Sequence, residues 1–361
     1  MLGRRSRHEE QLETLRALLQ FDPYDMEAMA ATYLPCAALA RWDEALRHLD
    51  RAHALDPSDY LCLFHLFQVR MNVGIRQADP RELERALPLA ERLVRLAPNL
   101  SSAWDSFAWV CCELGRAEEA IEALLQFVQD HPNDPEGHAA LRWRGRTVLP
   151  GIELFAHARR AYELAPGSWF TCWTFLVAAL GLPEAGAAAE RSVVADLLGS
   201  IMERHPNHFQ VIAAAAHVCR KWGEPERGLH LARRAMALAP DTEEAQTELA
   251  RTLASLGRWN ELIAEFGTRF AQPEDLPSHC LVLYGKALRH TRHARADALL
   301  EAALGRAAQR QDDLLEARLY AAWGREEEAR VACLRGLRIS PLAPHRRAWL
   351  QHVLTSLAEA E

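Results

Sequence analysis

Two pairs of histidines come nearest, in residue type and spacing, to a metal site. His205 precedes His208 and His290 precedes His293, so each pair places two imidazoles three positions apart. A zinc site needs three or four converging ligands, commonly with cysteine or a carboxylate at short spacing. Neither pair has such a third ligand nearby in the sequence. We therefore expect no metal and no other cofactor.

Motifs for covalent or phosphate chemistry are absent from the sequence. It contains no Gly-x-Ser-x-Gly elbow, no glycine-rich phosphate loop and no dinucleotide-binding fingerprint. Carboxylate pairs at helical spacing are present, but such pairs usually lie on solvated helix faces. General acid–base catalysis needs a shaped pocket that excludes water. We expect a protein that is not an enzyme. An enzyme with its site on the insertions near residues 75–80 and 182–186 is an alternative of lower weight.

The stretch from Ser101 to Pro132 predicts two helices joined by a tight turn. Apolar residues recur at steps of three and four from Trp104 to Leu114, which is the spacing of one helix face. Gly115 follows, and a helix can close there with a left-handed residue at no steric cost. A second apolar run ends before Pro132, which cannot continue a helix. Such a hairpin leaves apolar surface uncovered, so it needs neighbours.

Prolines mark repeats of this hairpin along the chain. They stand at positions 23, 57, 98, 132, 166, 206, 240, 273 and 341. Steps of 34 residues, or one residue fewer, recur between them, two steps are longer by six or seven residues, and the last step is two periods long. A fixed period in this range is the signature of stacked supersecondary units. It predicts an array of helical hairpins.

In the hairpin that ends at Pro132, five residues match a known repeat: Trp104, Ala108, Gly115, Ala120 and Pro132. The chain resembles tetratricopeptide-repeat (TPR) proteins, which have a large residue early in the first helix (helix A), small residues at helix contacts and a terminal proline. Later turn glycines and further small residues of helix B also match: Gly223, Gly257, Gly324, Ala45, Ala86, Ala329, Ala52, Ala161 and Ala235. The resemblance implies an all-α fold of helix-turn-helix repeats in a right-handed superhelix, an α-solenoid.

The resemblance covers nearly the whole chain, so we expect a single superhelical domain over residues 1–361. Residues 4–21 form an amphipathic capping helix, residues 24–341 form about nine repeats, and residues 343–358 form a closing helix. Caps are needed because the last apolar face of a solenoid must be hidden from water. The repeat at 274–309 departs most from the family, since Ala307 replaces the proline and the turn has no glycine.

In TPR proteins the A helices line the concave surface, so the resemblance implies that a partner binds there. Trp104 fills the family's large core place, whereas other tryptophans and arginines fall on outward places of the A helices. Such residues often anchor interfaces. The expected partner-binding groove consists of Phe64, Met71, Trp109, Trp143, Arg146, Phe170, Trp173, His217, Arg220, Lys221 and Arg251.

These residues favour a non-catalytic adaptor that binds a protein or peptide segment in the groove. The segment would carry apolar anchors for the aromatic residues and an acidic residue for Arg220 and Lys221. The alternative is a substrate-recognition or regulatory subunit of a separately encoded modifying enzyme.

Charge and composition bear on partners and compartment. The net charge of −7 opposes a general attraction to nucleic acid or to an anionic membrane, so neither is expected as a partner. The longest apolar run, Val211–Ala216, is too short to span a bilayer, and the first residues have no apolar stretch typical of a secretory signal. Eight scattered cysteines fit a reducing compartment. We expect a cytoplasmic protein.

Overall fold

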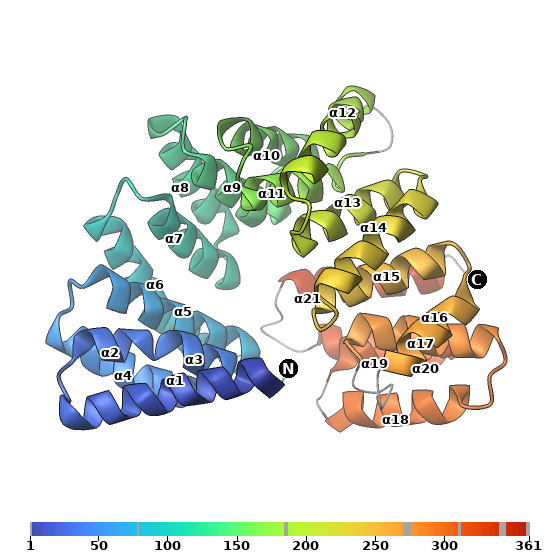
Figure 1. The fold of residues 1–361 in the computed structure, drawn as a ribbon, viewed down its shortest axis with the longest axis horizontal. Helices are drawn as coiled ribbons and strands as arrows, with labels where there is room; N and C mark the ends of the chain where they lie inside the picture. Colours follow the sequence, from blue (N-terminus) through green and yellow to red (C-terminus); the bar gives the residue numbers. More distant parts are fainter. Residues whose placement is uncertain are drawn as a thin grey trace. The chain divides into compact units, whose positions relative to one another are not determined.

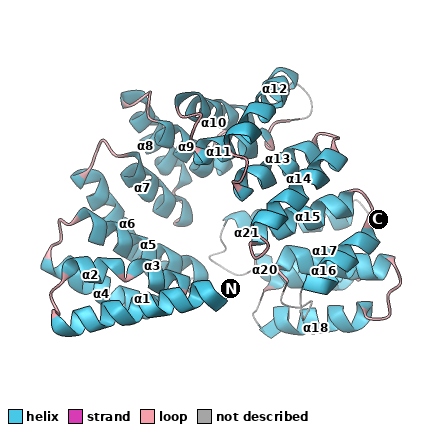
Figure 2. Cartoon of the chain, in the orientation of Figure 1, coloured by secondary structure: helices cyan, strands magenta, loops and turns pink. Residues whose placement is uncertain are grey.

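A computed structural model describes residues 2–77, 79–183, 187–269, 276–309, 312–338 and 344–358. Within these ranges the chain forms helices and the turns between them, and no strand occurs (Figure 2). The predicted all-α fold is therefore confirmed. The chain divides into two compact units, residues 1–183 and 184–361, which are described separately below.

Unit 1 contains a first helix, four hairpins and the A helix of a further repeat (Figure 1). The first hairpin has a divided A helix, α2 and α3, which meet at Thr32. The elements are α1 (Leu2–Phe21), α2 (Met26–Ala31), α3 (Tyr33–Ala38), α4 (Trp42–Leu55), α5 (Tyr60–Gln77), α6 (Pro80–Leu96), α7 (Ser101–Glu113), α8 (Ala117–Asp130), α9 (Pro135–Arg144), the 3-10 turn η1 (Gly145–Thr147), α10 (Gly151–Leu164) and α11 (Trp169–Ala179).

Unit 2 begins with the B helix of that further repeat and adds four hairpins and a last helix. The elements are α12 (Ala188–Arg204), α13 (Phe209–Lys221), α14 (Pro225–Leu238), α15 (Glu243–Ser255), α16 (Trp259–Arg269), α17 (Ser278–His290), α18 (Ala296–Gln309), α19 (Asp313–Trp323), α20 (Glu326–Leu337) and α21 (Pro344–Ala358). The predicted repeat between the prolines at positions 166 and 206 is thus shared between the units. A single domain over residues 1–361 stays a prediction.

Local sequence explains where several helices begin. Asp25, Asp79, Asp134 and Asp312 each precede a helix, and each carboxylate accepts a hydrogen bond from a backbone N–H of the first turn. These N–H groups have no partner inside the helix, so an N-cap side chain satisfies them. Two of these aspartates are followed directly by proline at the first helical position, where its missing N–H costs nothing.

The core of each unit lies between its packed helices. In unit 1, Leu63 and Phe67 of α5 pack with Leu93 of α6 and Val110 of α7, and all four are fully buried. The small residues predicted at helix contacts, Ala45, Ala52, Ala86, Ala161, Ala235 and Ala329, are also fully buried. Their size allows the helix backbones to approach closely, as the repeat requires.

The first predicted insertion is mostly helical in the residues that the structure describes. Helices α5 and α6 contain 18 and 17 residues, whereas α7 and α8 contain 13 and 14. The extra residues near Ile75 therefore lengthen both helices, and Asp79 caps the second one. The second insertion includes residues 184–186, which lie outside the described residues.

The turns between A and B helices contain residues with left-handed backbone geometry. Gly115, Gly223, Gly257 and Gly324 have φ values of 79°, 89°, 66° and 73°. Ala40 and Arg292 occupy the same place in their hairpins with φ values of 56° and 53°. A residue with a Cβ atom pays roughly 1–2 kcal/mol for this geometry. The repeat at 274–309 thus keeps the turn geometry without the glycine.

Glycine at these two turns is expected to stabilise the protein. Arg292→Gly and Ala40→Gly should each raise the free energy of unfolding by about 0.5–1 kcal/mol, because relief of the left-handed strain outweighs the added freedom of the unfolded chain. Chemical denaturation measures this. The reverse control is Gly115→Ala, which should cost about 1 kcal/mol for backbone reasons alone, since nothing lies within 4 Å of an added Cβ. A loss of stability in Arg292→Gly would contradict the prediction.

Candidate partner-binding site

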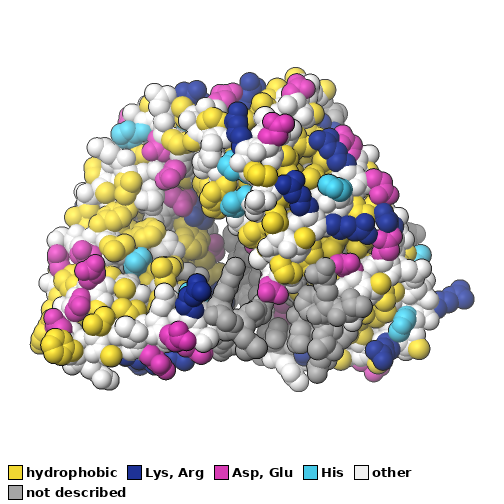
Figure 3. Space-filling model, viewed as in Figure 1, with side chains coloured by type: hydrophobic (Ala, Val, Ile, Leu, Met, Phe, Trp, Pro, Cys, Tyr) yellow, Lys and Arg dark blue, Asp and Glu magenta, His cyan; other side chains and the backbone are white. Residues whose placement is uncertain are grey.

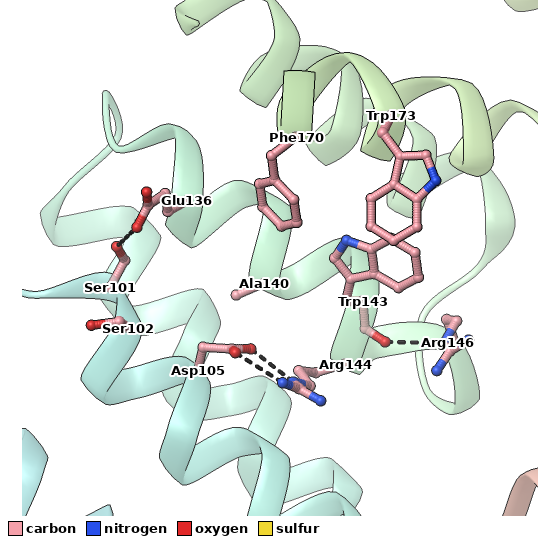
Figure 4. Close-up of a pocket in the computed structure, with 10 residues that line it drawn as sticks. All are labelled: Ser101, Ser102, Asp105, Glu136, Ala140, Trp143, Arg144, Arg146, Phe170 and Trp173. Atoms are coloured by element: carbon pink, nitrogen blue, oxygen red, sulfur yellow. Dashed lines mark hydrogen bonds and ion pairs between the residues drawn. The ribbon is translucent and has the colours of Figure 1, made fainter. Parts of the chain in front are cut away.

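Unit 1 contains a pocket of about 490 Å³ on its A helices α7, α9 and α11 (Figure 4). This volume is within the range of roughly 300–1,000 Å³ that is usual for ligand sites. The aromatic rings lie on one side of the pocket and an ion pair lies across from them. The pocket is lined by Ser101, Ser102, Asp105, Glu136, Ala140, Trp143, Arg144, Arg146, Phe170 and Trp173.

The aromatic side of the pocket is built on two stacked indoles. The rings of Trp143 and Trp173 lie with centroids 4.6 Å apart, and Phe170 lies 6.1 Å from Trp173. The indole N–H of Trp143 donates to Oγ1 of the buried Thr174 at 3.1 Å, so its polar atom is satisfied inside the protein. Arg146 donates to the backbone carbonyl of Trp143 at 3.0 Å. The rings are therefore held in place before any partner arrives.

The polar side of the pocket is a bidentate ion pair between Asp105 and Arg144, which lie on neighbouring A helices. Nε and Nη2 of Arg144 donate to the two carboxylate oxygens of Asp105 at 2.7 and 2.8 Å. Burial lowers the pKa of Arg144, but the charge and hydrogen bond of Asp105 outweigh it, so the pKa is raised. The guanidinium also lies 5.0 Å from the ring of Trp109. A fixed ion pair facing aromatic rings suits a bound side chain that is apolar.

Four of the predicted groove residues line this pocket: Trp143, Arg146, Phe170 and Trp173. Phe64 and Trp109 are partly buried against the core of α5 to α7. Hydrophobic side chains also gather on the face of unit 1 over α5 and α6 (Figure 3). Met71 is not a groove residue, because its side chain is fully buried in that core. It continues the row of Leu63 and Phe67 at steps of four on α5.

Trp104 was expected in the core and is only partly buried. Its ring packs against Phe127, with centroids 6.0 Å apart, and its N–H donates to the carbonyl of Pro98 at 2.7 Å. The residue lies in the first turn of α7, so its polar edge reaches the preceding loop. An indole N–H usually finds a partner where a tryptophan is buried.

The remaining predicted residues lie on unit 2. His217, Arg220 and Lys221 belong to α13, Arg251 belongs to α15, and Lys221 is exposed. His217, Arg220 and Arg251 lie near three further residues that the sequence analysis did not select. We call the six residues the arginine cluster: His217, Arg220, Glu248, Arg251, His279 and Arg318, on the A helices α13, α15, α17 and α19.

Glu248 is the buried carboxylate of the arginine cluster. Its side chain is 5% exposed, and Arg220 donates to it at 2.9 Å. Burial raises the pKa of Glu248 although Arg220 acts in the opposite direction. His217 lies 3.6 Å from the same carboxylate. Burial, followed by Arg220, lowers the pKa of His217 to about 3, so this contact is not an ion pair at neutral pH.

His279 lies between the other two arginines. Nη2 of Arg251 is 2.6 Å from its Nε2, and Nη1 of Arg318 is 3.2 Å from its Nδ1. Burial and the two guanidiniums lower the pKa of His279 to about 3, so the imidazole is neutral at pH 7. Burial, then repulsion from Arg251, lowers the pKa of Arg318 to about 10.

The number of residues between the two members of each pair is a signal from which these contacts could have been predicted. Arg220 and Glu248 are 28 residues apart, and Arg251 and His279 are also 28 residues apart. The same separation joins Arg16 to Glu44 and Arg233 to Glu261. In an array with a 34-residue period, a residue 28 positions further along the chain lies on the equivalent helix of the next repeat. It lies one to two helical turns before the equivalent position on that helix. A search for charged pairs at this step would have selected Glu248 and His279.

The pKa values of several cysteines are raised, unlike those of reactive thiols. All eight are free. Burial raises the pKa of Cys62 and Cys280 to about 12, and of Cys36, Cys111 and Cys333 to about 11. A thiol needs a lowered pKa to act as a nucleophile at neutral pH. Among the described residues, no three His, Cys, Asp or Glu side chains converge as metal ligands would.

None of the helices that the structure describes combines the length and the apolar character needed to cross a bilayer.

Comparison with protein families and with curated proteins finds no match. Solved structures do match. A tetratricopeptide repeat protein from Parabacteroides merdae is 12% identical, over 67% of this chain and 91% of that chain, with a TM-score of 0.48. YrrB, a TPR protein with an unusual peptide-binding site, is 14% identical, over 65% and 96%, with a TM-score of 0.33. A human IFIT1 dimer with PPP-AAAA is 13% identical, over 94% and 80%, with a TM-score of 0.49.

These likenesses are too distant to say anything about function. The class of protein follows from the helices themselves. Hairpins at a 34-residue period, left-handed turns between their helices and fully buried alanines at the helix contacts define an α-solenoid of the tetratricopeptide-repeat type.

Proposed function

We propose that the protein is a non-catalytic adaptor that binds a segment of a partner protein along the A helices. An apolar side chain of the segment, aromatic or branched, enters the pocket of unit 1 and packs against Phe170 and the stacked Trp143 and Trp173. The observation that carries this proposal is the partial exposure of these three rings in a pocket where Asp105 and Arg144 pair with one another, Glu136 accepts a hydrogen bond from Ser101, and Arg146 donates to the carbonyl of Trp143.

Physical chemistry supports an apolar anchor over a charged one. Rings that are held rigidly lose little conformational freedom when a partner covers them, so more of the buried area becomes binding free energy. Both carboxylate oxygens of Asp105 already accept hydrogen bonds from Arg144. A charged side chain placed beside Asp105 and Arg144 would have to compete with that pair, whereas an apolar side chain against the rings only replaces water. The raised pKa values of the buried thiols give no support to a catalytic role.

The proposal is tested with peptides selected from a random displayed library against the full chain. Phe170→Ala and Trp173→Ala should each weaken binding of the selected peptides by about thirtyfold, which corresponds to about 2 kcal/mol for an interface anchor. Fluorescence anisotropy gives the dissociation constants. Phe21→Ala is the control, because Phe21 is 92% exposed on α1 and does not line the pocket. Equal affinity of the wild type and both pocket variants would refute the proposal.

A further inference from the structure

Arg142, which precedes Trp143 on α9, is a buried arginine. The residue is 6% exposed, and neither Nε nor Nη1 has a hydrogen-bond partner within the part of the chain that the structure describes. Its guanidinium lies 4.0 Å from the centre of the Trp143 ring. Burial, followed by repulsion from Arg146, lowers the pKa of Arg142 to about 10, so the side chain keeps its charge at pH 7. Unit 1 therefore holds a buried positive charge against an aromatic ring of the pocket.

Arg146 adds a second positive charge, and it lines the pocket itself. The residue is exposed, and its guanidinium lies 5.7 Å from the ring of Trp143. Its Nε donates to the carbonyl of Trp143, whereas its Nη groups have no partner among the described residues. Loss of hydration, followed by repulsion from Arg144, lowers the pKa of Arg146, and the negative charge of Glu113 does not fully offset this. We call Arg142 and Arg146 the arginine pair.

The two carboxylates that line the pocket are engaged elsewhere. Asp105 pairs with Arg144. Glu136 accepts a hydrogen bond from Ser101 at 3.3 Å and lies at the end of the pocket opposite to Arg146 (Figure 4). The arginine pair therefore has no carboxylate at ion-pair distance among the described residues. An anionic group that arrives at this end of the pocket meets free N–H donors, and the protein around the pair screens the attraction less than water does.

We propose that Arg146, supported by the buried charge of Arg142, recognises a side-chain carboxylate of the bound protein segment, beside the apolar residue that enters the pocket. The carboxylate accepts hydrogen bonds from the Nη groups of Arg146, because the planar guanidinium matches its two oxygens. This inference rests on the proposed function for the identity of the ligand, a protein segment. An acidic segment is favoured over nucleic acid, because the chain as a whole carries a net charge of −7.

Geometry limits the distance between the acidic residue and the apolar one. The guanidinium of Arg146 lies 5.7 Å from the ring of Trp143, against which the apolar side chain packs. In an extended segment, side chains on one face are two residues and roughly 7 Å apart. In a helical segment, side chains on one face are three or four residues apart. The acidic residue is therefore expected within four positions of the apolar one.

The test extends the library selection against the full chain. Peptides selected by the wild type should share an aspartate or glutamate at one position within four residues of the apolar anchor. One selected peptide is then made with a C-terminal amide, so that its carboxylates are those of its side chains. Replacing its acidic residue by the matching amide residue should weaken binding to the wild type about tenfold, as expected for a hydrogen-bonded charged group.

Variants of the arginine pair separate recognition from structure. Arg146→Gln should bind the acidic and the amide peptide alike, and Arg142→Met should reduce the difference between them by about threefold. A purely structural change would weaken both peptides equally. Arg142→Met should also melt at or above the temperature of the wild type, because it removes a buried charge. Arg95→Gln is the control, since it removes the same charge from an exposed arginine of α6 outside the pocket.

Three results would overturn the inference. The first is a set of selected peptides that share an apolar anchor and no acidic residue, which would leave the proposed function standing. The second is an undiminished preference for the acidic peptide in Arg146→Gln. The third is competition by hexaadenylate that is lost in Arg146→Gln, in place of a preference for the acidic peptide, which would assign the arginines to nucleic acid.

Two further results bear on single parts of the site. A melting temperature of Arg142→Met well below that of the wild type would make Arg142 structural and contradict its part in recognition. The proposed function fails separately, if Phe170→Ala binds the selected peptides as tightly as the wild type does.

Discussion

Phe175→Ala is expected to lower the free energy of unfolding of the protein by about 3–5 kcal/mol, the usual cost of truncating a large aromatic residue in a core. Phe175 is fully buried on α11. Its ring stacks on Tyr162 with centroids 5.1 Å apart and lies 5.4 Å from the ring of Phe155, both on α10. Removing the ring leaves a cavity between α10 and α11. Urea denaturation measures the loss.

The matched control lies five positions earlier on the same helix. Phe170 is partly exposed in the pocket, so Phe170→Ala should leave the free energy of unfolding close to that of the wild type. The two variants delete the same atoms from one helix, and therefore separate packing from partner contact. If both lost the same stability, Phe170 would be a core residue and the pocket would not be a preformed site.

Acidification below about pH 6.5 is expected to destabilise the protein. In the folded chain the pKa of His157 is lowered to about 4 by burial and by His138, whose Nδ1 lies 3.0 Å from its own. The pKa values of His217 and His279 are lowered to about 3. In the unfolded chain, histidine titrates near 6.5. Below that value the unfolded state therefore binds more protons than the folded state, so stability falls as the pH falls.

The pH range over which stability is lost follows from these histidine pKa values. The contribution of each histidine is fully present above about pH 6.5 and is lost progressively down to the folded pKa. Denaturation at a series of pH values from 7.5 to 4.5 should show a steadily decreasing free energy of unfolding. Replacing both His138 and His157 by glutamine should make the decrease shallower, whereas His230→Gln, at an exposed position of α14, should not change it. A flat profile down to pH 5 would contradict the prediction.

Much of the fold could be predicted from the sequence, because prolines and turn glycines act locally. Gly115 and Gly257 adopt the left-handed geometry for which only glycine has no penalty. Each therefore marks a turn whatever surrounds it. Ala40 and Arg292 show the limit of this signal, because both adopt the same left-handed geometry although neither residue type favours it.

Less of the candidate site could be predicted, because it depends on which face of a helix its neighbours cover. The rings of Trp143, Phe170 and Trp173 were among the candidates, and the structure brings them together in one pocket. Met71 was assigned to the wrong face of α5, although it follows Leu63 and Phe67 at steps of four on the side of the helix that is buried in the core. Arg144 was missed since it pairs with Asp105 across 39 residues, a separation that periodicity does not specify.

The stacking of Trp143 on Trp173 gives the protein an optical reporter at the place where a partner is proposed to bind. Two indoles with centroids 4.6 Å apart have electronic transitions that couple to one another. The coupled pair produces a near-ultraviolet circular dichroism signal that depends on the angle between the rings. Because one ring comes from α9 and the other from α11, any sliding of these helices changes that angle. Occupation of the pocket can thus be followed in the unmodified protein, without a dye or a label.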